Sequence, residues 1–170
     1  MRGAARLALA VAAGLASASA AQADLAFIDD RCLEPFFGGA SSLPTAGLEA
    51  IEHGGAQFYR GSRSDQLLSG DLGNDWLRAC NVAWSPGGEA DVIVRRWREL
   101  MLAYGLDAPE GCVRGGNGER QFYAVSQTSN AAGLYPFGQL ILSDDGRRAW
   151  TQMSETDAPY PIQFECPDAL

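Results

Sequence analysis

Apolar side chains recur at helical spacing along residues 89–104, and charged side chains occupy the opposite side. The apolar stripe consists of Ile93, Trp97, Leu100, Met101 and Tyr104. A stripe of this width is typical of an amphipathic helix that packs on a core. The pattern therefore predicts one long amphipathic helix over about residues 89–104, with Gly105 as its C-terminal cap.

Two shorter helices are expected near the N-terminus. The first covers residues 24–34, where apolar residues recur at helical spacing until Pro35 ends the pattern. Its apolar positions are Leu25, Ile28 and Cys32. The second covers residues 44–53 and is closed by Gly54 and Gly55.

Alternating and continuous apolar segments predict the strands. The clearest strand is residues 76–84, where both alternating sets of residues are mainly apolar, so we expect a central strand covered on both faces. Further strand signals lie at residues 57–60, 66–69 (weak), 120–127, 138–143 and 147–153. The last two are joined by Asp144-Asp145-Gly146, and Asp-Gly between alternating segments is typical of a β-hairpin.

This order of elements indicates an α+β fold. We expect an antiparallel sheet of about four to five strands, with the long helix and the short N-terminal helices packed on it. The tripeptide Gln-Phe-Tyr occurs at residues 57–59 and again at 121–123, but the flanking residues differ, so the sequence indicates no internal repeat.

The N-terminal segment carries the three parts of a bacterial-type secretory signal. Two arginines precede a purely apolar, small-residue run at 7–16, and residues 21–23 read Ala-Gln-Ala, an A-x-A cleavage site. The run is about half of the roughly 20 residues that a membrane anchor needs. We therefore expect residues 1–23 to be a cleavable signal peptide and 24–170 a single globular domain. Export would follow the general secretory route to the periplasm or the extracellular space, with no membrane insertion after cleavage.

The charge is strongly acidic and argues against two classes of partner. The chain carries 13 basic and 21 acidic residues. Removing residues 1–23 takes away two arginines and no acidic residue, so the net charge changes from −8 to 11 − 21 = −10. Nucleic-acid binding needs a basic surface, and attachment to anionic lipid is disfavoured for the same reason. The chain has no lysine, which excludes Schiff-base chemistry and a lysine-containing phosphate loop.

Four cysteines lie in the predicted mature chain: Cys32, Cys80, Cys112 and Cys166. An even number of cysteines in an exported chain favours disulfide bonds. None of them lies two to four residues from another, as a zinc site requires. We expect two disulfides and no metal site. Three connectivities are possible, and Cys32–Cys80 with Cys112–Cys166 is the favoured one.

His53 is the only histidine, so a Ser-His-Asp or Cys-His mechanism would have to use it. Its expected place at the end of a short helix is explained by the helix dipole without any catalytic role. Carboxylate pairs occur at Asp29-Asp30 and Asp144-Asp145, and glycoside hydrolysis uses two carboxyls. A solvated helix face and a turn, respectively, account for these two pairs.

Residues 70–77 resemble one turn of the RTX calcium-binding repeat. The glycines of the pattern fall at Gly70 and Gly73, and its last positions at Asp75 and Leu77, whereas Asp71 replaces the second glycine. Repeats of that family bind calcium between successive turns, and a single copy lacks the partner turn. A Gly/Asp turn is the simpler interpretation. The resemblance leaves Asp71, Asn74 and Asp75 as candidate calcium ligands, since hard cations accept such oxygens.

The chain has four tryptophans, at positions 76, 84, 97 and 150. Three of them lie on the predicted helix stripe or on the strand face that carries Cys80, where core packing explains them. Trp150, on the last predicted strand, is the candidate for a stacking surface.

No catalytic residue and no cofactor is assigned from these patterns. The leading hypothesis is a non-enzymatic periplasmic or secreted module that binds a partner protein, a peptide or an envelope glycan, as inhibitors and accessory subunits do. The alternative is a carboxylate-dependent hydrolase that acts on envelope material. A deep cleft with two carboxyls and an aromatic ring would favour the enzyme, whereas a shallow patch on a sheet edge or face would favour binding.

Overall fold

A computed structural model of the chain describes residues 22, 24–63, 65–72, 77–87, 89–107, 113–115 and 117–157. The predicted signal peptide lies outside the described residues apart from position 22, and Cys112 and Cys166 lie outside them as well. The predicted second disulfide is therefore not described.

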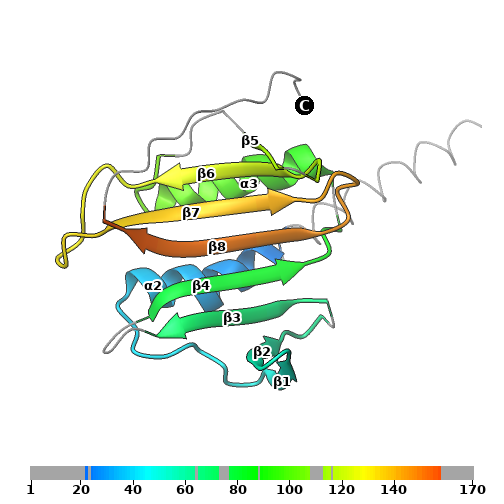
Figure 1. Cartoon of the computed structure of the whole chain (residues 1–170), viewed down its shortest axis with the longest axis horizontal. Helices are drawn as coiled ribbons and strands as arrows, with labels where there is room; N and C mark the ends of the chain where they lie inside the picture. Colours follow the sequence, from blue (N-terminus) through cyan, green and yellow to red (C-terminus); the bar gives the residue numbers. More distant parts are fainter. Residues whose placement is uncertain are drawn as a thin grey trace, which may run out of the picture.

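The described strands form one antiparallel sheet of eight, in the order β1-β2-β3-β4-β8-β7-β6-β5 (Figure 1). Their bounds are β1 (Glu49–His53), β2 (Ala56–Arg60), β3 (Leu67–Leu72), β4 (Leu77–Trp84), β5 (Val113–Arg114), β6 (Arg120–Val125), β7 (Tyr135–Leu142) and β8 (Ala149–Thr156). The α+β class and the antiparallel sheet are confirmed. The expected number of strands, four to five, is wrong.

The sheet consists of two halves of the same topology. In each half a helical segment precedes a four-stranded meander, and β4 of the first half pairs with β8 of the second. The two Gln-Phe-Tyr segments lie on β2 and β6, which hold the same place in the two halves. They differ in register, because Tyr59 of β2 packs against the core whereas Phe122 of β6 is the buried residue. The Gln-Phe-Tyr match is therefore not a sequence trace of the structural repeat.

The N-terminal helical segment is longer than predicted. Residues 24–28 are helical and continue through a π-helical turn, η1 (Asp29–Leu33), into α2 (Glu34–Phe37). The expectation that Pro35 ends the helix is wrong. Pro35 lies at the start of α2, directly after the π-helical turn, and a proline inside a helical segment removes one backbone hydrogen bond without always ending the segment.

The expected long helix is present as α3 (Ala90–Ala103), with Glu89 and Tyr104 at its caps. Gly105 follows with a φ of 78°, as expected for a helix-terminating glycine. The buried residues of α3 are Ile93, Val94, Trp97 and Met101.

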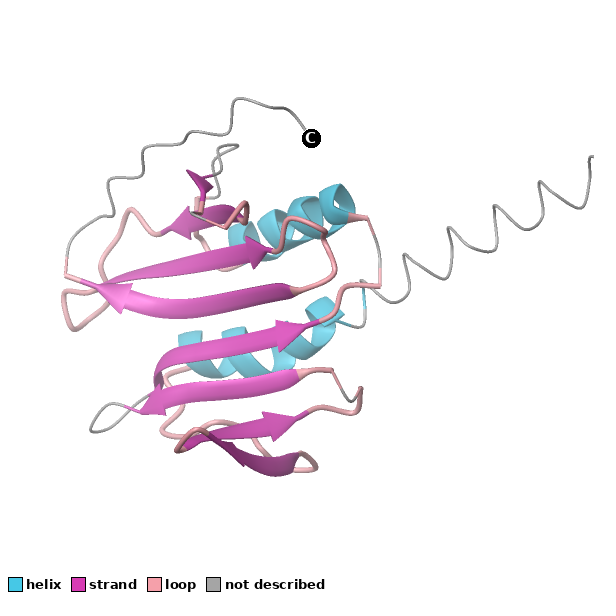
Figure 2. Cartoon of the chain, turned by 45° about the vertical axis from the view of Figure 1, so that its right-hand side comes forward, coloured by secondary structure: helices cyan, strands magenta, loops and turns pink. Residues whose placement is uncertain are grey.

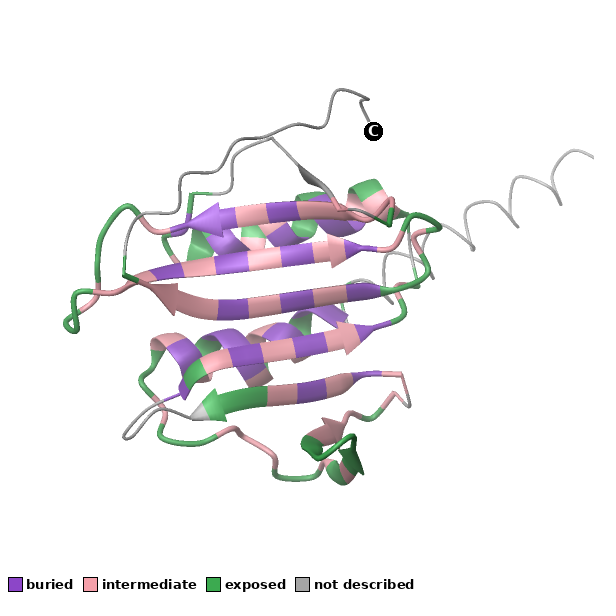
Figure 3. Cartoon of the chain, viewed as in Figure 1, coloured by how far each residue is buried: buried purple, intermediate pink, exposed green. Residues whose placement is uncertain are grey.

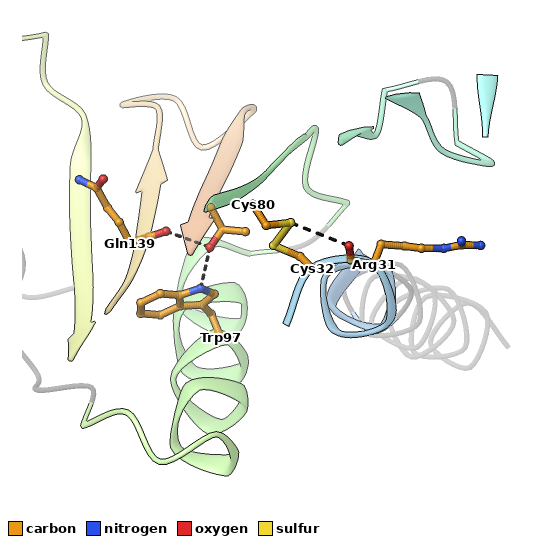
Figure 4. The surroundings of a disulfide bond; sticks show 6 residues. Arg31, Cys32, Cys80, Trp97 and Gln139 are labelled. Carbon is orange, nitrogen blue, oxygen red and sulfur yellow. Dashed lines mark hydrogen bonds between the residues drawn. A yellow bond between two sulfur atoms is a disulfide. The ribbon is translucent and has the colours of Figure 1, made fainter. Parts of the chain in front are cut away.

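Both helical segments cover the same face of the sheet (Figure 2). The segment η1–α2 packs on β4, and α3 packs on β6 and β7. A disulfide between Cys32 of η1 and Cys80 of β4 ties the first of these to the sheet, with a Cα–Cα distance of 5.6 Å (Figure 4). The favoured pairing of Cys32 with Cys80 is therefore present in the structure.

The predicted helix over residues 44–53 is wrong. Residues 49–53 form β1, and Gly54 and Gly55 join it to β2 with φ values of 61° and 80°. Positive φ at both central residues is typical of a type I′ hairpin turn. The glycine pair that looked like a helix end is therefore a hairpin turn.

None of the described helices lies on the opposite face of the sheet, which we call the helix-free face. Along β4, β7 and β8, buried residues alternate with half-exposed ones, as the striped strands of Figure 3 show. The expectation that β4 is covered on both faces is wrong, because Asn81 and Ala83 lie on this helix-free face and remain half-exposed. Both side chains are too small to need a second covering layer. No helix among the described residues is long and apolar enough to span a membrane.

Candidate functional site

One row of polar side chains crosses the helix-free face. Its members pair as cross-strand neighbours from β3 to β6: Ser69 with Asn81, Asn81 with Gln152, Gln152 with Gln139, and Gln139 with Tyr123. We call these five residues the amide row. Four steps between strands of about 4.8 Å give it a length of about 19 Å.

Hydrogen bonds order one end of the amide row. The Gln139 side-chain amide donates to the Tyr123 hydroxyl at 2.9 Å and to Gln121 Oε1 at 3.1 Å, and the Tyr123 hydroxyl donates to the same oxygen at 2.9 Å. Near the other end, Asn81 Oδ1 is covered by its neighbours and has no hydrogen-bond partner among the described residues. An acceptor left in this state costs about 1–3 kcal/mol, so the row is ordered at one end and holds an unsatisfied acceptor near the other.

An apolar row runs beside the amide row on the same face. On β7 and β8 it lies two residues closer to the turn that joins these strands. It pairs Leu67 with Ala83, Ala83 with Trp150, and Trp150 with Ile141. Because Ala83 is small, a hollow of about 250 Å³ opens beside the Trp150 ring. Trp150 is half-buried there, and its role as a stacking residue stays a prediction.

The centre of this face carries no full charge. The amide row consists of serine, asparagine, glutamine and tyrosine side chains and contains no carboxylate, guanidinium or imidazole. Among the described residues, the hollow beside Trp150 is lined by one acidic residue, Glu119, and one basic residue, Arg148. Arg60 of β2 forms an ion pair with Glu49 of β1 at 3.1 Å. The amide row and the hollow are therefore polar and close to neutral, although exposed Asp71 lies on the same face two residues beyond Ser69 and the predicted mature chain carries a net charge of −10.

A second cavity, of about 380 Å³, lies on the helix-covered side between α2 and the loop that joins β6 to β7. It is mainly apolar, and Glu155 is the acidic residue that lines it.

The structure brings none of the predicted catalytic candidates together. His53 is exposed at the end of β1, beside the hairpin turn and not at a helix end. Asp29 accepts a hydrogen bond from Tyr104 at 2.5 Å. Asp145 caps its own turn, where hydrogen bonds from Ser143 and from the backbone of Arg147 lower the pKa of its carboxyl.

The candidate calcium ligands are only partly described. Asp71 is exposed on β3, next to an irregularity in its pairing with β4. Asn74 and Asp75 lie outside the described residues, so the resemblance to a calcium-binding turn stays a prediction. Within the part of the chain that the structure describes, no three His, Cys, Asp or Glu side chains are grouped as metal ligands.

Two of the other tryptophans are explained by packing in the core. Trp84 and Trp97 are 3% and 0% exposed and belong to the core, and Trp76 lies outside the described residues. The amide row was missed from the sequence. A signal was present in the alternation of polar residues at positions 121, 123, 139 and 152, but only the strand order shows that they share one row.

Comparison with known proteins gives no relative: no family model, no curated protein and no solved structure matches the chain.

Proposed function

We propose that the chain is a non-enzymatic binding module that holds a neutral, extended glycan on the helix-free face of its sheet. The observation that carries this proposal is the amide row, a continuous band of hydroxyl and carboxamide groups across five strands. Carboxamides donate and accept hydrogen bonds at once, which suits neighbouring sugar hydroxyls. The Trp150 ring, next to its hollow, offers an apolar surface for the C–H face of a sugar ring.

Charge supports a neutral ligand. An acidic glycan would require basic side chains, which pair with carboxylates through charge-assisted hydrogen bonds. The amide row offers none, and Arg148, the arginine found in the hollow among the described residues, is accompanied by Glu119.

A peptide is a less suitable occupant of this face. Extended peptides bind sheets mainly by adding a strand to an exposed edge, where backbone groups are unpaired. At one edge of the sheet, β1 carries exposed Glu49 and Glu52, and charged side chains on an edge strand discourage such pairing.

The carboxylate-dependent hydrolase has less support. A glycosidase needs two carboxyls about 5 to 10 Å apart on either side of the scissile bond. Within the described part of the chain, each of the two cavities is lined by one carboxylate, Glu119 in one and Glu155 in the other. A sheet face with an aromatic ring and amides provides contacts for binding but no acid–base pair.

The test is calorimetric titration of the protein, with its disulfide intact, against a neutral β-linked tetrasaccharide, a uronic-acid tetrasaccharide and an extended tetrapeptide. We expect the neutral glycan to bind best. Trp150→Ala should weaken binding about tenfold through loss of ring contact, and Gln152→Ala about fivefold through loss of one hydrogen bond.

Gln57→Ala is the matched control, because Gln57 is an exposed glutamine of β2 outside the amide row. It should bind like the unmodified protein. The proposal is wrong if no neutral glycan binds, if the peptide binds in its place, or if Gln57→Ala loses as much affinity as Gln152→Ala.

A further inference from the structure

A buried polar cluster joins Asp24 to the loop between β2 and β3. Asp24 is 3% exposed, and Gln66, at the end of the loop, is 2% exposed. Asp24 Oδ1 accepts hydrogen bonds from Arg63 Nη1 at 2.7 Å and from Gln66 Nε2 at 3.0 Å. The residue directly after the predicted cleavage site is therefore fixed inside the folded domain.

Negative charge exceeds positive charge among these side chains. Arg63 is shared between two carboxylates, because its Nη2 also donates to Asp65 Oδ2 at 3.3 Å. Asp24 Oδ2, the second oxygen of the buried carboxylate, has no hydrogen-bond partner among the described residues. Burial raises the pKa of the Asp24 carboxyl although Gln66 and Arg63 stabilise its charged form. A further positively charged donor at Asp24 Oδ2 would satisfy this oxygen and balance the two carboxylates.

The chain itself supplies such a donor when it is processed. Cleavage after Ala23, which the sequence predicts, converts the backbone nitrogen of Asp24 from a neutral amide into an α-amino group. With its ordinary pKa of about 7.7–8.0, an α-amino group is mostly protonated at neutral pH. It belongs to the same residue as Asp24 Oδ2, so the two groups cannot lie far apart. Because the chain has no lysine, this group is the only amine of the processed protein.

We infer that the processed N-terminus is a working part of the fold, in which the α-ammonium group of Asp24 pairs with Asp24 Oδ2 and completes the buried cluster. The inference uses the predicted cleavage after Ala23 and is independent of the proposed glycan face. In the uncleaved chain the same nitrogen carries no charge, so processing stabilises the domain. Because Asp24 is buried in the folded domain, the cut precedes complete folding or requires local unfolding.

The absence of lysine provides the first test. The protein is secreted from a bacterial host, shown by N-terminal sequencing to begin at Asp24, and treated with N-acetoxysuccinimide, both folded and in urea. Hydroxylamine then removes acetyl groups from hydroxyls, and intact mass reports acetylation of the one amine. We expect the folded protein to be acetylated at least tenfold more slowly than the unfolded protein.

The second test measures whether the charge stabilises the fold. Protein acetylated in urea, with its disulfide intact, is refolded and compared with the free amine by urea unfolding. Acetylation should raise the equilibrium constant for unfolding at least fivefold, but less than twofold in the Asp24→Asn variant, where the carboxylate is absent. Asp30→Asn, which removes an exposed carboxylate of η1, is the matched control and should show the full effect.

Three outcomes would overturn the inference. They are equal acetylation rates in the folded and the unfolded protein, an equal effect of acetylation with and without the Asp24 carboxylate, and an exported chain that begins at a residue other than Asp24. The acetylation rate is measured on the protein without substitutions, so the first outcome can be read even if Asp24→Asn does not fold.

Discussion

Replacing Thr151 by valine removes one buried hydroxyl from the middle of the sheet. Thr151 lies on the helix-covered face of β8 and is 0% exposed, as is Trp97 of α3 above it. Trp97 Nε1 donates to Thr151 Oγ1 at 3.0 Å, and Thr151 Oγ1 donates to the backbone oxygen of Gln139 at 2.9 Å (Figure 4). Valine has nearly the same shape, so the substitution removes these bonds without opening a large cavity.

The expected loss of stability follows from the groups that remain. The bond to Thr151 is the hydrogen bond that the Trp97 N–H makes within the described core, and a buried donor left without a partner costs about 1–3 kcal/mol. The added methyl group offsets up to about 0.8 kcal/mol. We therefore expect Thr151→Val to lower the free energy of unfolding by about 1–2 kcal/mol, measured by equilibrium unfolding in urea with tryptophan fluorescence.

A double-mutant cycle separates this hydrogen bond from a change in packing. In the Trp97→Phe background the indole N–H is absent, so Thr151→Val should cost less than about 0.5 kcal/mol. An equal loss in both backgrounds would show that packing, and not the bond from Trp97, accounts for the effect, and the reasoning above would be refuted.

Three further predictions concern stability. The Cys32→Ala/Cys80→Ala double variant should lose about 4 kcal/mol in urea unfolding, because the crosslink joins residues 48 apart in sequence; a loss below about 1 kcal/mol would contradict this. Burial raises the pKa of the Asp24 carboxyl above 3.8 despite its hydrogen bonds with Gln66 and Arg63. A raised pKa in the folded state means that folding favours the protonated acid. The free energy of unfolding of the uncleaved protein should therefore fall relative to that of its Asp24→Asn variant as the pH rises from below 3.8 through the folded-state pKa. A difference between the two urea midpoints that stays the same at every pH would refute this prediction. Gly55→Ala should cost about 1–2 kcal/mol, because a φ of 80° is strained for any residue with a Cβ, and an unchanged melting temperature would show that the turn tolerates a side chain.

The sequence patterns predicted the elements whose structure depends mainly on residues close together in the chain. The long helix α3 was predicted because its 14 residues carry an uninterrupted helical stripe. The hairpin between β7 and β8 was predicted from its Asp-Gly turn. Strand β5 was missed because it has two residues, too few for any alternation to show. Strand β1 was misread because its closing glycine pair suits either a helix end or a type I′ turn.

The candidate site could not be predicted in the same way, because it depends on pairing between distant strands. The sequence pattern explained three tryptophans by core packing and left Trp150 as the exception, and the structure places Trp150 on the helix-free face. Asn81 and Gln152 are 71 positions apart and become neighbours only because β4 pairs with β8. No periodicity within either strand specifies that pairing or its register, so the amide row follows from the topology and not from a motif.

The pairing of β4 with β8 connects the core to the proposed binding face. It joins the two halves of the sheet, and the amide row crosses it between Asn81 and Gln152. Because side chains alternate between faces, a slip of one residue would turn Gln152 inward and Thr151 outward. The same slip would break the hydrogen bond from Trp97, so this buried bond favours the one register in which Gln152 lies in the amide row. Thr151→Val should therefore affect glycan affinity as well as stability, although Thr151 lies on the opposite face of the sheet.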